Sequence, residues 1–235
     1  MKPALGKAAP FDAATIQLNS HLTRTERGVL DSLVSPARIQ AFLDTLPYSE
    51  DHFYRSPLRV LHERKAHCFD GALFAAMALR RLGYPPKILE LLPNERDDDH
   101  LVALFRQGGC WGAVAQSNFP GLRFREPIHR SLHELAMSYF EDFFNTAGEK
   151  TLRGYRGPVN LRRYDNLSWM EGDSGLEQLS ESLDLYPITT LITEDLARDL
   201  EPLDERSLRA GLTGTNPAGL FKVPKGRRRK SEQGT

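Results

Sequence analysis

The sequence is poor in cysteine and in long apolar runs. Its 235 residues include two cysteines, Cys68 and Cys110, too few for the disulfide framework of a small secreted domain. The longest uncharged apolar run, residues 71–79, is well short of the ~18 residues that a membrane span requires. The N-terminus also lacks the apolar stretch of a signal peptide. We therefore expect a cytoplasmic protein with no membrane partner.

Net charge is absent too: 31 Lys and Arg balance 31 Asp and Glu. This balance argues against nucleic-acid binding by the chain as a whole. Basic residues do gather near the C-terminus, at Lys225, Lys230 and residues 227–229. Because no aromatic residues are interleaved among them, this tail is expected to touch nucleic acid only weakly. With 40% hydrophobic and 26% charged residues, the composition is that of a globular protein.

The chain can be divided by its hydrophobic pattern. The pattern predicts a helix over residues 68–82, where Gly83 and the prolines that follow it would end the helix. Its interior is apolar on every side, which indicates a helix surrounded by other elements. Strands are predicted over residues 87–92, 100–105 and 110–116. A buried helix followed by antiparallel strands indicates an α+β fold.

Four parts follow from this reading. The first is a loosely ordered lead-in, and the second is a core containing the helix and the strands. The third packs on that core as a C-terminal extension, and the last is a basic, disordered tail. Their boundaries are residues 1–22, 23–150, 151–212 and 213–235.

Cys68 is the most informative residue for function. It would stand at the start of the buried helix, where backbone N–H groups and the helix dipole favour a thiolate. Asp70 in the first turn would oppose this effect. A cysteine can equally be a small hydrophobic residue of the core. His100 shifts the balance, because it opens a strand downstream and an imidazole can take the thiol proton during acyl transfer.

The segments HCFDGALFAAMALRRLGYPP and DDDHLVALFRQGGCWGAVAQSNF resemble the transglutaminase-like superfamily, which has a papain-like thiol-enzyme core. The resemblance covers residues 35–145, about half of the chain. It implies a central helix that bears the nucleophile Cys68, packed on an antiparallel sheet that bears His100. It implies a peptide or protein substrate, and neither cofactor nor metal. It does not fix the substrate.

The third member of the triad departs from the family pattern. The family has an aspartate four residues after a tryptophan on the strand that follows the histidine, and counting from Trp111 gives Ala115. A hairpin with a two-residue turn at Gly108-Gly109 would instead place Ser117 opposite His100. Ser117 is therefore the first choice. Other turns give Gln116 or Ala115, and Asn118 is a further candidate. A neutral partner would orient the imidazole but stabilise its cation less than a carboxylate would.

Other histidines offer alternatives. The backbone N–H of Cys68 would contribute to an oxyanion hole, and His62 and His67 are expected to be polar residues near the approach to the helix. His129 and His133 have a four-residue spacing, but the capping box at Ser131 places His129 outside the helix. A metal site could be assembled from His67, Cys68, His100, Cys110 and the acidic residues 97–99, without any tight ligand pair.

The sequence thus predicts a transglutaminase-like thiol enzyme that transfers or hydrolyses an acyl group at an amide carbonyl. The first alternative is a non-catalytic protein with the same core, which binds a partner peptide in its cleft; the missing aspartate at Ala115 supports it. The second is a metal-dependent hydrolase.

Overall fold

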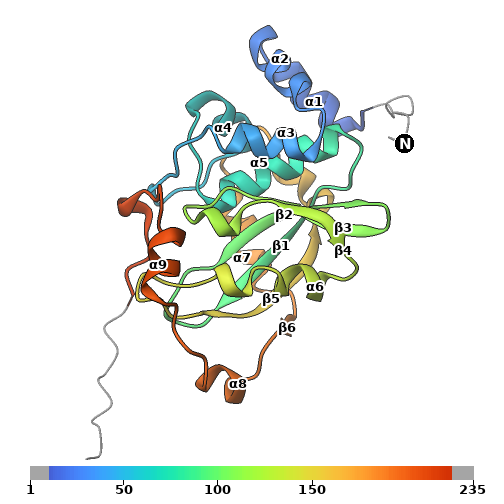
Figure 1. Cartoon of the computed structure of the whole chain (residues 1–235). Helices are drawn as coiled ribbons and strands as arrows, with labels where there is room; N and C mark the ends of the chain where they lie inside the picture. The colour runs from blue at the N-terminus through green and yellow to red at the C-terminus, as the bar shows by residue number, and fades with distance from the viewer. Residues whose placement is uncertain (1–10, 224–235) are drawn as a thin grey trace, which may run out of the picture.

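The computed structural model describes residues 11–223. Its architecture is α+β, with one antiparallel sheet of six strands in the order β4-β3-β2-β1-β5-β6 and helices on both faces (Figure 1). Within the described residues no helix is both long and apolar enough to cross a membrane. The strands are β1 Lys87–Pro93, β2 His100–Gln107, β3 Cys110–Val114, β4 Arg125–His129, β5 Leu152–Asn160 and β6 Ile188–Thr190.

The helices divide between the two faces of the sheet. The first hydrophobic core contains residues of α1 to α5 and α7, and the second contains residues of α6 and of the turns around it. The helices are α1 Ala13–His21, α2 Arg24–Ser32, α3 Pro36–Leu43, α4 Pro57–Glu63, α5 Cys68–Arg81, α6 Leu132–Met137, α7 Leu176–Leu183, α8 Glu194–Arg198 and α9 Glu205–Gly211. Short 3-10 turns are η1 Pro120–Leu122, η2 Phe140–Asp142, η3 Leu161–Leu167 and η4 Pro217–Gly219.

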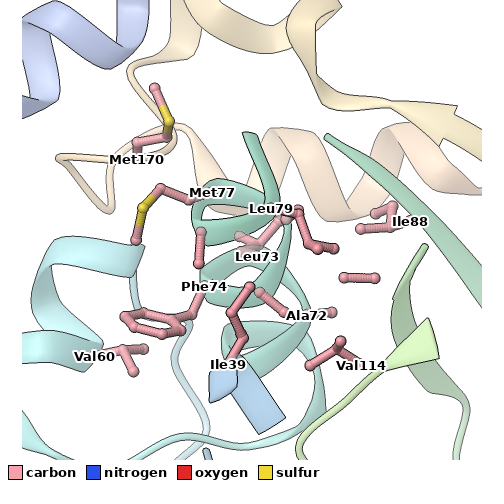
Figure 2. Packing of buried hydrophobic residues seen from close by; sticks show 14 of the residues in the cluster. Ile39, Val60, Ala72, Leu73, Phe74, Met77, Leu79, Ile88, Val114 and Met170 are labelled. Atoms are coloured by element: carbon pink, nitrogen blue, oxygen red, sulfur yellow. The ribbon is translucent and has the colours of Figure 1, made fainter. Parts of the chain in front are cut away.

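Helix α5 is the centre of the first core (Figure 2). It begins with a capping box formed by His67 and Asp70, and Gly83 follows its end with a positive φ of 89°. Leu73 and Phe74 in its interior are completely buried. A cap contributes about 1 kcal/mol, whereas burying each such side chain contributes about 2–3 kcal/mol. Packing therefore holds α5 in place, and the caps set where it begins and ends.

Strand β2 separates the two cores by the alternation of its side chains. Leu101, Ala103 and Phe105 face the first core with α5, while Val102 and Leu104 face the second. Strand β3 continues the alternation, since Val114 belongs to the first core and Ala113 and Ala115 belong to the second. This alternation determines on which side of the sheet each candidate site residue lies.

The predicted hairpin between β2 and β3 has the two-residue turn. Gln107 pairs with Cys110, and both turn glycines have positive φ, 58° at Gly108 and 83° at Gly109. Such a turn needs positive φ at both central positions, which glycine adopts without a steric penalty. The pairing of β2 with β3 extends as far as Ala103 and Val114. The same register continued beyond this pair sets His100 opposite Ser117.

The later parts of the chain take part in the main body of the structure. Strand β5 pairs with β1, so residues 152–160, which were assigned to the C-terminal extension, lie inside the sheet. The lead-in contains α1, whose Leu18 is buried. Residues 213–223, assigned to the disordered tail, include η4 and lie against the loops that precede α5 (Figure 1). The basic residues of the tail from Lys225 onward lie outside the described residues.

Candidate functional site

Cys68 is the first residue of α5, and its position follows from the cap before it. The ring Nδ1 of His67 accepts a hydrogen bond from the backbone N–H of Phe69 at 3.2 Å. The carboxylate of Asp70 accepts one in return from the N–H of His67, at 3.3 Å. With His67 as the N-cap, the helix begins at Cys68. Cys68 is partly exposed there.

A cavity of about 710 Å³ opens at Cys68. The rings of Tyr48, Tyr54 and His67 line it, together with a C-terminal segment, residues 218–222. A cavity of this size can hold a short stretch of polypeptide or a ligand of similar volume. Six carboxyl groups also line it, those of Glu50, Asp51, Glu90, Asp98, Asp99 and Glu177.

These surroundings oppose the thiolate at Cys68. Burial of the thiol raises its pKa, and the carboxylates of Asp99 and Asp98 raise that pKa further. The sequence predicted the reverse, a thiolate favoured by the helix N-terminus. That prediction is wrong for this structure, because the free energy lost by desolvation and by nearby negative charge exceeds the modest effect of a helix end.

The sulfur lies next to backbone and carboxyl groups of the loop that leads into β2. Cys68 Sγ lies 4.0 Å from the carbonyl oxygen of Asp99. Asp99 lies near Glu90. Burial is the main cause that holds the pKa of Asp99 well above the usual value, and the carboxyl group of Glu90 acts in the same direction. Burial also raises the pKa of Tyr48.

The imidazole of His100 lies on the side of the second core. Its Nε2 is 2.7 Å from the carbonyl oxygen of Leu122, and Leu122 belongs to the second core, as does Val102 two residues further along β2. Because a carbonyl only accepts hydrogen bonds, Nε2 must carry the proton, which leaves Nδ1 as the acceptor. Burial lowers the pKa of His100 to about 4, so the ring is neutral near pH 7.

Within residues 11–223 no hydrogen bond joins the His100 ring to Cys68 Sγ. The two residues line different cavities. Cys68 lines the large one, and His100 lines a smaller one of about 50 Å³. Tyr48, Asp98 and Asp99 line both cavities. The cavity of Cys68 and the cavity of His100 therefore adjoin at the loop before β2. Pairing of Cys68 with His100 stays a prediction.

The candidates for the third triad position have other partners. Ser117 Oγ accepts from the backbone N–H of Phe119 at 3.1 Å, and the Gln116 side-chain amide donates to the carbonyl of Leu46 at 3.0 Å. The side chain of Asn118 contacts Asn216. The carbonyl of Leu122 is the group that orients the His100 ring here. The role of Ser117 as third member likewise stays a prediction.

His67 is the histidine that shares the large cavity with Cys68. Burial lowers its pKa to about 4, and the guanidinium of Arg55 acts in the same direction. Arg55 is buried, and its backbone N–H donates to Asp70 Oδ1 at 2.7 Å. Burial raises the pKa of Asp70 to about 7. His62 lies elsewhere, with Nε2 2.5 Å from Glu26 Oε1.

The alternative sites find little support in the geometry. Among residues 11–223 no group of three His, Cys, Asp or Glu side chains is arranged to hold a metal ion. Cys68 and Cys110 are both free thiols. His129 ends β4, whereas His133 lies in α6, so the two histidines do not share one helix face.

Three features of the site escaped the sequence analysis. Tyr48 and Glu90 come from segments without a motif. The only feature of the sequence that could have pointed to them is a polar side chain next to apolar neighbours. Asn216 lies in a segment whose glycine and proline content indicated disorder. Long-range packing brings Tyr48 and Glu90 to the lining of the Cys68 cavity, and Asn216 into contact with Tyr48.

Comparisons with known proteins give distant similarity. The sequence matches no protein-family profile and no curated protein. Among solved structures, Legionella pneumophila LapG aligns with 16% identity and a TM-score of 0.33 over 48% of this chain and 74% of that chain. An EGTA-treated form of LapG aligns with the same identity and TM-score, over 46% of this chain and 72% of that one.

Proposed function

We propose that this chain is a transglutaminase-like thiol enzyme that acts on an amide carbonyl of a peptide or protein, with Cys68 as the nucleophile. The observation that carries the proposal is the position of Cys68 at the N-terminal end of a buried helix, open to a cavity of about 710 Å³. Such a position presents the sulfur to a bound chain while the helix keeps it fixed. We include a reducing, cytoplasmic compartment in the proposal, since the chemistry needs a free thiol.

The reaction would follow the general course of thiol acyl transfer. The thiol gives its proton to a base, and the sulfur forms a bond with the carbonyl carbon. The carbon–nitrogen bond then breaks, and the leaving amine takes up the proton. Water or a second amine cleaves the thioester, which regenerates the thiol. The backbone N–H of Cys68 would stabilise the negative oxygen of the tetrahedral intermediate.

Two histidines are candidates for the base. His100, the residue proposed from the sequence, has its Nδ1 available, because Nε2 donates to Leu122. It must approach Cys68 from the other side of the β2 entry. His67 lines the same cavity as Cys68, but its Nδ1 is engaged with the N–H of Phe69. We propose His100 as the base, and Ser117 as a second group that could orient it.

The test is intact-mass analysis after incubation with a peptide that carries a thiol-directed electrophile. We expect one adduct on the parent chain and on Cys110→Ala, the matched control, and none on Cys68→Ala. The rate should fall by 10²-fold or more in His100→Ala if His100 is the base, and little in His67→Ala. An adduct that persists in Cys68→Ala would contradict the assignment of the nucleophile.

A second function, peptide binding without catalysis, is favoured by the acidic surroundings that raise the pKa of Cys68. A binding protein needs no thiolate. It predicts that peptide affinity survives Cys68→Ala and that activated esters produce no acyl-enzyme mass. A stable acyl-enzyme that is absent from Cys68→Ala would exclude this alternative.

A further inference from the structure

The C-terminal strap, residues 216–222, is held against the loops that form the Cys68 cavity. The side-chain amide of Asn118 forms two hydrogen bonds with the backbone of Asn216. Its Oδ1 accepts from the N–H of Asn216 at 2.7 Å, and its Nδ2 donates to the carbonyl of the same residue at 2.9 Å. This pattern recognises a backbone and no particular side chain, as a neighbouring strand would.

The side chain of Asn216 adds contacts on the other wall of the cavity. Its Nδ2 donates to the carbonyl of Tyr48 at 3.0 Å and lies 3.2 Å from Glu50 Oε2. Asn216 thus connects the loop after β3 with the loop between α3 and α4. Asn216 makes four hydrogen bonds to other segments, two through its backbone and two through its side chain. A chain end that is not packed on the protein would form fewer.

Gly219 fits closely against Tyr48. A Cβ built at Gly219 would lie 2.9 Å from Tyr48 Cδ1 and 3.1 Å from Cε1. A larger residue at this position would therefore collide with the ring. The strap has a small residue, Ala218, before this glycine, and Leu220 and Phe221 after it, all of which line the cavity.

The strap also lines the cavities of both proposed catalytic residues. Residues 218–222 line the cavity of Cys68, and both Gly219 and Phe221 line the smaller cavity of His100 as well. Exposed Lys222 lines the same cavity as six acidic side chains, so the strap carries a charge opposite to theirs. In the sequence, further basic residues follow Lys222.

We propose that the strap is a ligand of the cleft carried by the chain itself, covering one side of the cavity in which a peptide would reach Cys68. The ligand class of the cleft is then a polypeptide with a turn that brings a glycine against Tyr48 and with a basic residue beyond it. The strap narrows the cavity of the full chain, and a peptide in trans must displace it to bind in its place. The assignment of the cleft to substrate rests on the proposed function, whereas the binding of the strap does not.

The experiment measures binding by the full-length chain rather than turnover. A fluorescent peptide with the sequence of residues 214–223 is titrated against the parent, Asn216→Ala, Gly219→Val and Arg209→Ala, an exposed residue of α9 that serves as the matched control. The tethered strap competes at a high effective concentration. We therefore expect the two strap variants to bind the peptide roughly tenfold or more tightly than the parent and the control.

Two further readouts make the outcome decisive. Iodoacetamide should modify Cys68, but not Cys110, several-fold faster in the strap variants, as located by peptide mapping. A peptide with valine in place of its glycine should bind none of the chains. If Asn216→Ala and Gly219→Val both match the parent in peptide affinity and in Cys68 modification, the strap does not occupy the cleft. Because no step needs catalysis, an inactive enzyme with a displaceable strap would overturn the proposed function and leave this inference standing.

Discussion

The imidazole of His100 is hydrogen bonded to the carbonyl oxygen of Leu122, with Nε2 and the oxygen 2.7 Å apart. The ring is buried at the start of β2, and this burial lowers its pKa to about 4, although the hydrogen bond to Leu122 acts in the opposite direction. The ordinary pKa of a histidine is about 6.5. Between these two values the unfolded chain binds a proton that the folded chain does not.

The stability contributed by this neutral ring is therefore fully present above pH 6.5 and is lost as the pH falls toward 4. The loss amounts to about 3 kcal/mol. His100→Gln keeps a donor for Leu122 but cannot titrate. Urea unfolding at pH 7.5 and pH 4.5 should show a loss of stability about 3 kcal/mol smaller in this variant than in the parent. Exposed His133→Gln should behave as the parent does, and an equal loss in all three chains would contradict the buried, neutral ring.

The close approach of α5 to the segment that follows β3 depends on Gly71. A Cβ at this position would lie 2.2 Å from Gln116 Cβ and 3.3 Å from Gln116 Cα. Gly71→Ala should lower the free energy of unfolding by about 1–3 kcal/mol, despite the better helix propensity of alanine. Gly28→Ala in α2, where nothing lies within 4 Å, is the matched control and should gain up to about 1 kcal/mol. Urea unfolding of both variants measures the difference.

Arg55 neutralises carboxyl groups around the start of α5. Its guanidinium contacts Asp51, and it lies 2.7 Å from Glu63 and 3.6 Å from buried Asp70. Arg55→Ala should reduce the free energy of unfolding by about 3–5 kcal/mol, since it leaves a buried acid without its cation. Arg59→Ala removes an exposed cation from Glu63 and Asp173, and should cost less than about 1 kcal/mol. Similar effects of the two replacements in thermal unfolding would argue against this assignment.

Removing one carboxyl group from the cavity should ease ionisation of the thiol. Asp99→Asn eliminates the negative charge that, after burial, acts most strongly on Cys68. The pH profile of Cys68 alkylation should move to lower pH, on the order of one unit. Glu177→Gln changes a carboxyl group that lines the same cavity but is not among the groups that act on the thiol. An equal displacement of the profile in both variants would show a general effect of cavity charge instead.

Much of the local structure could be predicted from the sequence, because its causes are local. The bounds of α5 follow from an N-cap, an apolar interior and Gly83 at its end, and the helix observed is Cys68–Arg81. The β2–β3 hairpin follows from two adjacent glycines, whose positive φ values permit the tight turn.

The direction and the chemistry of the site residues could not be predicted in this way. Whether His100 faces α5 depends on the alternation of β2 relative to both cores, and the structure directs its ring to Leu122. The ionisation of Cys68 depends on Asp98 and Asp99, which arrive from another segment. Desolvation and Coulomb interactions act through space and leave no pattern in a sequence.

The sequence by itself determined the scarcity of cysteine, which leaves Cys68 and Cys110 as the thiols of the chain. It also determined the helix and the strands that present Cys68. The tertiary structure alone decided that the residues of the presumed tail return to the cavity, because the contacts of Asn216 with Asn118 and Tyr48 join segments about 100 and 170 residues apart. Such contacts exist only once the chain is folded, since their free energy must exceed the entropy lost in closing long loops.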